Sequence, residues 1–264
     1  MSVLCVVGNY VWGVTQLHDV VYVVCGASST IRRFNATTHQ PLTEINVKDL
    51  SLPRDIVVCE RTSQLYVAEF HECVWRVSSD GTDIKHWLPK SPDDTFKPDT
   101  LSVTSTRLLV TSWHTRQLRQ FDADGDELRR VQPPDHMEPR HAVESPTGTF
   151  IVSLYNKQLK QCQVVEVNTG GEVLRQFSGS RLASLGATLH IAVDSHGNIF
   201  VADSVNRHIL LLDDHLSLRR VIIDEHQLNY EEPPWRLCYR EDKGQLLVGF
   251  YDSRAVAVFD VICR

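Results

Sequence analysis

The sequence predicts an all-β protein, a six-bladed β-propeller, and three observations support this fold class. An apolar tetrad with valine in third place recurs six times across the 264 residues, with its valines at positions 23, 67, 110, 152, 201 and 248. A period in the forties that is rich in β-forming residues is typical of propellers, in which each repeat is one small sheet. Each repeat also divides into short strand-like runs separated by polar turns, which indicates four-stranded antiparallel blades.

The fifth repeat shows the four expected strands most clearly, at residues 189–193, 199–202, 209–212 and 218–223. Turn-forming residues separate them at 194–198, 203–207 and 213–215. In the other repeats the tetrad is the second strand. Third strands are expected at 31–34, 74–77, 118–121, 164–167 and 256–259, and fourth strands at 42–47, 84–88, 128–131 and 173–177.

The sixth repeat lacks a fourth strand, because only residues 260–264 follow its third one. The strand-like run at 3–7 has no place in the first repeat. An open ring would leave two edge strands exposed to aggregation, so we expect residues 2–7 to form the outer strand of the last blade. The expected blades are 8–47, 52–88, 97–132, 138–178, 187–223 and 234–264, which make residues 1–264 a single domain.

Composition restricts the function classes. A hydrophobic share of 42% and a charged share of 23% are ordinary for a globular protein, and no apolar run is long enough to span a bilayer. We expect a cytoplasmic monomer without a membrane partner. The seven cysteines form no CxxC pair, which favours reduced core thiols over disulfides or a zinc site. The net charge of −6 argues against a duplex DNA partner but leaves room for a local basic patch.

One repeat carries a recognisable motif. The run from Asp194 to Ile209 closely resembles the core of an NHL repeat, with Asn206-Arg207-His208-Ile209 in the place of the Asn-His-Leu signature. The other repeats keep only its spacing. The resemblance implies a six-bladed NHL propeller, like the C-terminal domain of TRIM-NHL ubiquitin ligases and of RNA-binding translational repressors. No RING, B-box or coiled coil is present in this chain, so the resemblance implies a binding or scaffold domain without ligase activity of its own.

The expected ligand site is one face of the disc. In a four-stranded blade, the loop between the second and third strands and the loop leading into the first strand emerge on the same face. Four of the six blades carry an aromatic residue two places after the tetrad, and three of the Pro-led loops carry arginine. The candidate ligand-binding residues are Arg54, Phe70, His71, Trp113, His114, Arg140, Tyr155, Asn156, Lys157, Asn206, Arg207, Arg236 and Tyr251.

Two ligand classes remain open for this face. Aromatic rings with arginine and lysine can stack unpaired bases and hold phosphates, as a single-stranded RNA site requires. The same residue types also form hot spots for protein partners. Alternatively, each ring could pack against the next blade, and each arginine could pair with a neighbouring carboxylate.

The enzyme alternative rests on weaker patterns. Six-bladed propellers similar in outline include calcium-dependent lactonases, and Glu69, Asn156, Asn206 and Asp252 occupy loop positions that could supply oxygen ligands for Ca²⁺. A related lyase domain uses zinc-binding histidines, but the histidines at 71, 114, 141, 190 and 208 lack a metal-ligand spacing. We therefore expect a non-catalytic module that needs no metal or cofactor.

Overall fold

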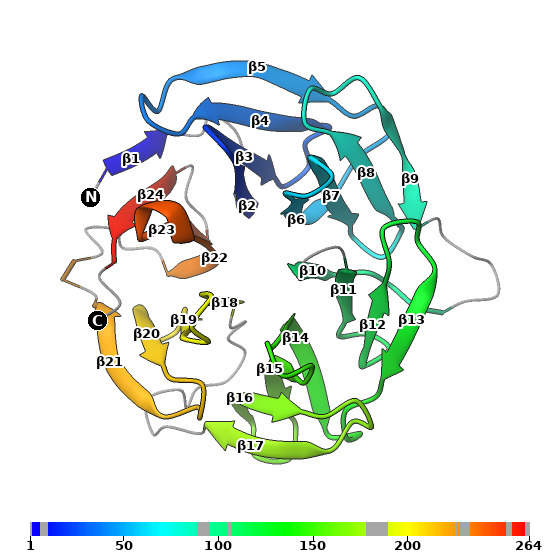
Figure 1. Ribbon diagram of the computed structural model, residues 1–264, viewed down its shortest axis with the longest axis vertical. Coiled ribbons are helices and arrows are strands. Elements are labelled where there is room, and N and C mark those ends of the chain that lie inside the picture. Colours follow the sequence, from blue (N-terminus) through cyan, green and yellow to red (C-terminus); the bar gives the residue numbers. More distant parts are fainter. Residues whose placement is uncertain are drawn as a thin grey trace.

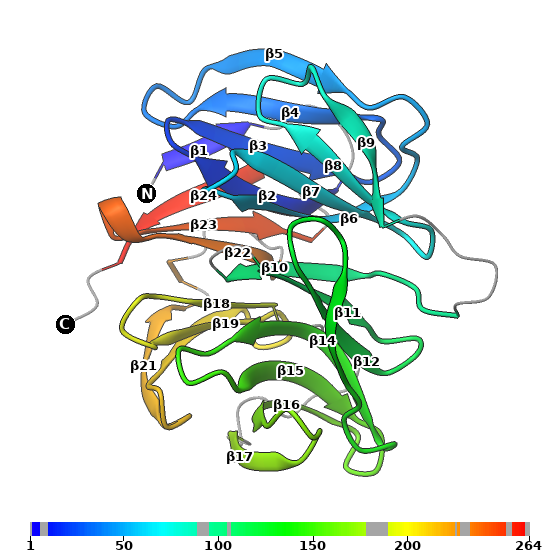
Figure 2. The same cartoon turned by 45° about the vertical axis from the view of Figure 1, so that its right-hand side comes forward.

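The structure is a computed structural model that describes residues 2–5, 10–88, 95–104, 107–177, 190–224, 226–227, 233–251 and 255–261. Six four-stranded antiparallel sheets surround a central axis, as the view down the shortest axis shows (Figure 1). Turning the molecule by 45° shows the sheets following one another around the ring (Figure 2). The predicted six-bladed propeller is confirmed.

Blades 1 to 5 each contain four strands that are consecutive in the chain. Blade 1 contains β2 (Val11–Leu17), β3 (Val20–Cys25), β4 (Thr30–Asn35) and β5 (Pro41–Asn46), and blade 2 contains β6 (Pro53–Cys59), β7 (Gln64–Glu69), β8 (Val74–Ser78) and β9 (Ile84–Leu88). Blade 3 contains β10 (Thr100–Thr104), β11 (Arg107–Ser112), β12 (Gln117–Phe121) and β13 (Glu127–Val131). Blade 4 contains β14 (Met137–Glu144), β15 (Phe150–Asn156), β16 (Gln161–Val167) and β17 (Val173–Phe177), and blade 5 contains β18 (His190–Val193), β19 (Ile199–Asp203), β20 (His208–Leu212) and β21 (Leu218–Ile223).

The last blade joins the two ends of the chain. Blade 6 contains β22 (Pro234–Arg240), the 3-10 turn η1 (Glu241–Lys243), β23 (Gln245–Phe250) and β24 (Ala255–Asp260). Its outer strand is β1 (Ser2–Cys5), which runs antiparallel to β24 with Ser2 opposite Val258 and Cys5 opposite Ala255. The expected closure is therefore confirmed for residues 2–5, and residues 6 and 7 lie outside the described residues.

The core lies between neighbouring blades. All six tetrad valines are 0% exposed, because the second strand of each blade has a strand on either side and a sheet against each face. One cluster, for example, joins Val24 and Ile31 of blade 1 to Ile56 and Val67 of blade 2. Cysteines 25, 59, 73 and 162 are buried and Cys238 is half-buried, as expected of core thiols. Within the described residues no helix is long and apolar enough to cross a membrane.

A β-bulge recurs near the start of the inner strand in four blades. The register shifts between Val11 and Gly13, Pro53 and Asp55, Pro139 and His141, and Pro234 and Arg236. The skipped residues are Trp12, Arg54, Arg140 and Trp235. A bulge changes the direction of two successive side chains. The skipped residue and the residue after it therefore point to different parts of the molecule.

Candidate functional site

The skipped residues and the loops between second and third strands meet on one face of the disc. Ring and guanidinium contacts link them from blade 6 through blades 1, 2 and 3 to blade 4. We call this surface the aromatic arc. It consists of Tyr10, Trp12, Arg54, Phe70, His71, Trp113, His114, Arg140, Tyr155, Trp235 and Tyr251.

The arc begins with four packed rings at the junction of blades 6 and 1. Tyr251 stacks on Tyr10 with ring centroids 6.0 Å apart and lies 4.7 Å from Trp235. Trp12 meets Trp235 edge to face at 5.8 Å. Blade 1 carries Gly26 where four other blades carry an aromatic ring, and a Cβ there would lie 2.5 Å from Trp12 Nε1. Glycine at this position therefore makes room for Trp12.

The middle of the arc is a continuous stack. The Arg54 guanidinium carbon lies 4.2 Å from the ring centroid of Trp12 and 4.2 Å from that of Phe70. His71 stacks on Phe70 with ring centroids 3.7 Å apart. The guanidinium is therefore held between two rings, and ring faces of both Trp12 and Phe70 are covered by residues of the chain itself.

The arc ends on blades 3 and 4. The Arg140 guanidinium carbon lies 5.4 Å from the Trp113 ring centroid and 6.0 Å from that of Tyr155. Its Nη2 donates to Glu138 Oε2 at 3.2 Å, and Lys157 Nζ lies 2.7 Å from Glu138 Oε1. Carboxylate pairing, which the sequence left open, is therefore present at this arginine.

The structure brings together eight of the thirteen candidates, namely Arg54, Phe70, His71, Trp113, His114, Arg140, Tyr155 and Tyr251. Lys157 joins them through Glu138. Asn156 is buried, and its Oδ1 accepts from the N–H groups of Gln158 and Leu159. The prediction that Asn156 lies on the face is wrong, because its side chain is buried and stabilises a turn.

The remaining candidates lie on blades 5 and 6. Asn206 Nδ2 donates to Asp203 Oδ2 at 2.7 Å, and Arg207 is exposed. Sequence reasoning missed Tyr10, Trp12 and Trp235 as members of the arc. The signal for Trp235 was its position directly after a proline, which matches that of Arg54 and Arg140.

Arg236 corrects another expectation, because it is only 3% exposed and does not reach the face. Its Nε donates to the Trp12 carbonyl at 2.7 Å, and its Nη2 donates to the Arg54 carbonyl at 3.1 Å. Nε also lies 3.9 Å from Asp55 Oδ1. Arg236 thus runs beneath the arc from blade 6 to blades 1 and 2.

Arg236 belongs to a ring of buried side chains that link the inner strands. We call the set Asp55, Thr100, His141, His190 and Arg236 the central belt. Asp55 Oδ2 accepts from the Leu101 N–H at 2.9 Å, and Thr100 Oγ1 donates to the Arg140 carbonyl at 2.8 Å. Each link joins one blade to the next, and the acceptors satisfy edge N–H groups that would otherwise be unpaired.

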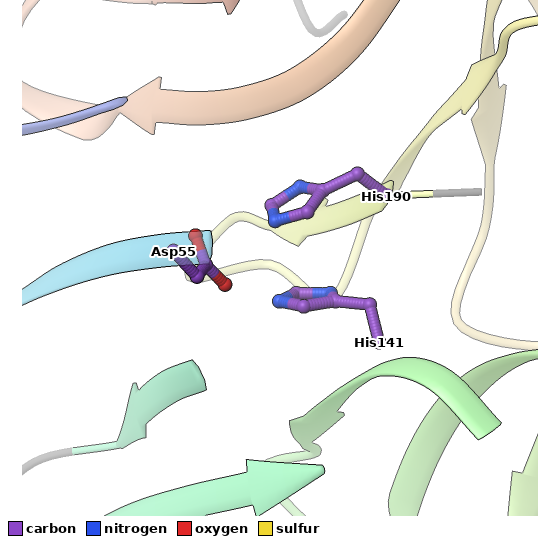
Figure 3. Close-up of side chains that lie close together, drawn as sticks. All are labelled: Asp55, His141 and His190. Carbon is purple, nitrogen blue, oxygen red and sulfur yellow. The ribbon is translucent and has the colours of Figure 1, made fainter. Parts of the chain in front are cut away.

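The two histidines continue the same pattern. His141 Nδ1 accepts from the Ile191 N–H at 3.4 Å, and His190 Nδ1 accepts from the Leu237 N–H at 3.3 Å. The two rings stack with centroids 3.8 Å apart. Figure 3 shows them side by side, facing Asp55.

Asp55, His141 and His190 have the spacing of a metal site, because their possible ligand atoms all lie within 4.8 Å of one another. The hydrogen bonds contradict a metal. A backbone N–H can only donate, so Nδ1 of each ring carries the lone pair and Nε2 carries the proton. His141 Nε2 then donates to the Leu101 carbonyl at 3.1 Å. Neither ring has a lone pair left for an ion, so the three residues do not fit one.

Burial fixes the protonation of these groups. It lowers the pKa of His141 to about 3 and holds the pKa of His190 well below its usual value, so both rings are neutral at pH 7. Burial also raises the pKa of Asp55 to about 6, although the nearby Arg236 opposes this change.

A cavity of about 600 Å³ extends along the inner strands from the belt residues to Glu60, Thr104 and Ser195. Aliphatic side chains such as Val14 and Ile191 form much of its wall. Its thiol, Cys238, is a poor nucleophile, because burial raises its pKa to about 11.

The calcium alternative depended on four residues, and three of these side chains already form hydrogen bonds within the fold. Glu69 accepts hydrogen bonds from the backbone and hydroxyl of Ser51, from Trp75 Nε1 and from Cys73 Sγ. Asn156 and Asn206 are bonded within their own blades. Asp252 lies outside the described residues.

The structure is a six-bladed β-propeller with an aromatic face. Comparison with known proteins supports this fold but indicates no function. No protein-family model and no curated protein sequence matches the chain, so the NHL resemblance has no support from these searches. Among solved structures, hydrazine synthase of Kuenenia stuttgartiensis is similar, with a TM-score of 0.68 and 14% identity. The match covers 96% of this chain and 84% of that one.

Proposed function

We propose that this propeller is a non-catalytic binding module of the NHL type whose aromatic arc holds a protein partner. The observation that carries the proposal is the stack of Trp12, Arg54, Phe70 and His71. Single-stranded RNA sites need ring faces on which bases can stack. Here Arg54 lies over both Trp12 and Phe70, and His71 covers Phe70 as well, so the stack presents mainly edges to a ligand.

Charge supports the same choice. Arg140 and Lys157 share Glu138, so this part of the face offers little unpaired positive charge to a phosphate backbone. Tryptophan, tyrosine and arginine are also the residues that most often dominate protein interfaces. The overall charge of −6 disfavours binding of a polyanion such as RNA, but it does not disfavour binding of a polypeptide in general.

The proposal can be tested without a known partner. Short random peptides displayed on phage should enrich against the wild-type protein, and binding of the enriched peptides should fall at least tenfold in a Trp113→Ala/Tyr155→Ala variant. The matched control is Leu128→Ala/Leu174→Ala, which removes two exposed apolar side chains from the outer strands β13 and β17. This control should bind like the wild type.

Two results would contradict the proposal. One is the absence of any enriched peptide that depends on the arc. The other is tight binding of a single-stranded RNA that weakens steeply with salt and depends on Trp113 and Tyr155, because that behaviour identifies a phosphate backbone.

A further inference from the structure

We infer that the partner presents an acidic side chain next to an apolar one, and that Arg54 and the pocket beside it receive this pair. The inference rests on the proposed function and specifies its ligand. Three features of the junction between blades 1, 2 and 3 support it: a pocket, an incompletely bonded guanidinium and further basic side chains nearby.

The pocket opens between blades 1 and 2. It has a volume of about 220 Å³ and is lined by Trp12, Gly26, Leu52, Pro53, Arg54 and Phe70. Leu52 is 47% exposed, so the lip of the pocket is apolar and accessible. Since one water molecule takes up about 30 Å³, the pocket has room for one large aliphatic or aromatic side chain.

The Arg54 guanidinium in this pocket forms an ion pair with Asp99 but donates no hydrogen bond to it. Its Nε is buried without a hydrogen-bond partner, and Asp99 Oδ1 lies 3.6 Å away, beyond hydrogen-bond reach. No hydrogen bond from Arg54 to any other described residue completes the group, and its side chain is 24% exposed. Burial accordingly lowers the pKa of Arg54, with Asp99 acting in the opposite direction.

Two other arginines differ from Arg54 at the ends of the guanidinium. Arg140 Nη2 donates to Glu138, although its Nε also lacks a partner, and Arg236 donates to the carbonyls of Trp12 and Arg54. A partly buried cation without such acceptors gains from each charge-assisted bond that a ligand supplies. A carboxylate is the group that matches a guanidinium in both charge and shape.

The surroundings of His71 reveal the sign of the local field. Burial is the main reason that the pKa of His71 is lowered, and Lys97, His114 and Arg54 lower it further, whereas Glu72 acts the other way. Arg54, Lys97 and the ionisable His114 therefore lie around His71, with Glu72 as the opposing carboxylate. These basic side chains attract an acidic residue of a partner, whereas the net charge of −6 of the protein as a whole repels it.

We assign the carboxylate to an Asp or Glu within the partner chain rather than to a chain terminus. The phage library tests this choice directly if its peptides are fused through their carboxyl ends, because no free terminus is then present. Enriched peptides should carry Asp or Glu within one or two positions of a large apolar residue.

Synthetic peptides with amidated ends then isolate the role of Arg54. Changing the enriched acid to its amide should weaken binding to the wild type about tenfold or more. In an Arg54→Met variant, acid and amide peptides should bind equally. Arg130→Met should retain the tenfold preference, because Arg130 lies on the outer strand β13, outside the arc, and is bonded to Glu127. Near-ultraviolet circular dichroism and thermal melting establish that both variants keep the fold.

The outcomes separate this inference from the proposed function. Arc-dependent peptides without an acidic residue, or an acid preference that survives in Arg54→Met, would overturn the inference and leave the function standing. Binding that requires a free carboxyl terminus would overturn it as well. Absence of any arc-dependent peptide would overturn both.

Discussion

Replacing Arg236 by methionine should destabilise the ring in a pH-dependent way. Methionine keeps much of the side-chain volume but removes the donors to the Trp12 and Arg54 carbonyls and leaves Asp55 without its buried partner. Breaking a buried ion pair from one side costs about 3–5 kcal/mol. We therefore expect the free energy of unfolding at pH 8 to fall by about that amount.

The loss should be smaller at pH 5. Burial raises the pKa of Asp55 to about 6 in the intact protein, so at pH 5 the carboxyl is mostly protonated and no ion pair remains to be broken. What is lost then is the bonding to the Trp12, Arg54 and Trp235 carbonyls alone, without the cost of an unpaired Asp55 charge. Asp55→Asn in the same background should recover part of the loss at pH 8, because it removes the unpaired charge.

Urea unfolding followed by circular dichroism at pH 8 and pH 5 measures both quantities. The four proteins are wild type, Arg236→Met, Asp55→Asn and the double variant, which together form a double-mutant cycle. An equal loss at the two pH values would refute the role of the ion pair. An unchanged midpoint at pH 8 would refute the structural role assigned to Arg236.

Three further predictions concern stability. Removing residues 2–7 should lower the melting temperature sharply, because β24 loses its outer partner; an unchanged calorimetric melt would contradict the closure. Acidification below pH 6 should lower the free energy of unfolding by about 1.4 kcal/mol per pH unit. His141 and His190 stay neutral in the folded protein but take up protons in the unfolded chain near pH 6.5, which favours unfolding. Asp55 takes up its proton more readily in the folded protein, which offsets the effect of one histidine. Denaturant titrations across pH 7 to 5 measure this slope, which His190→Gln should reduce. Gly171→Ala should cost more than 1 kcal/mol in urea unfolding, because Gly171 has a φ of +90° and a Cβ there would lie 2.2 Å from the Gln132 carbonyl oxygen.

The fold could be predicted from the sequence because every blade repeats the same strand pattern. The second-strand valines marked the middle of each sheet, and the shortage of one strand after Phe259 pointed to the N-terminal run. These are local patterns in which each repeat supports the others. Positions two places after the tetrads therefore identified Phe70, Trp113, Tyr155 and Tyr251 correctly as neighbours on one face.

The candidate site was predicted less completely because the bulge shifts side chains by one position. Arg54 and Arg140 directly follow a proline and occupy the skipped position, whereas Arg236 is one residue further on and turns inward. A shift of one residue reverses the side of a strand on which a side chain lies. The roles of His141 and His190 could not be foreseen, since their bonding partners Ile191 and Leu237 are about 50 residues away in the chain.

The pairing of β1 with β24 also sets the order in which the molecule can fold. Blades 1 to 5 consist of consecutive hairpins, so each can form as soon as its own stretch of chain is available. Blade 6 must wait for residues 255–260 to meet residues 2–5, a contact between strands about 250 residues apart in the sequence. Until then the growing protein carries an unpaired edge at each end, and this late step is where we expect the slowest refolding phase and the greatest need for protection against self-association.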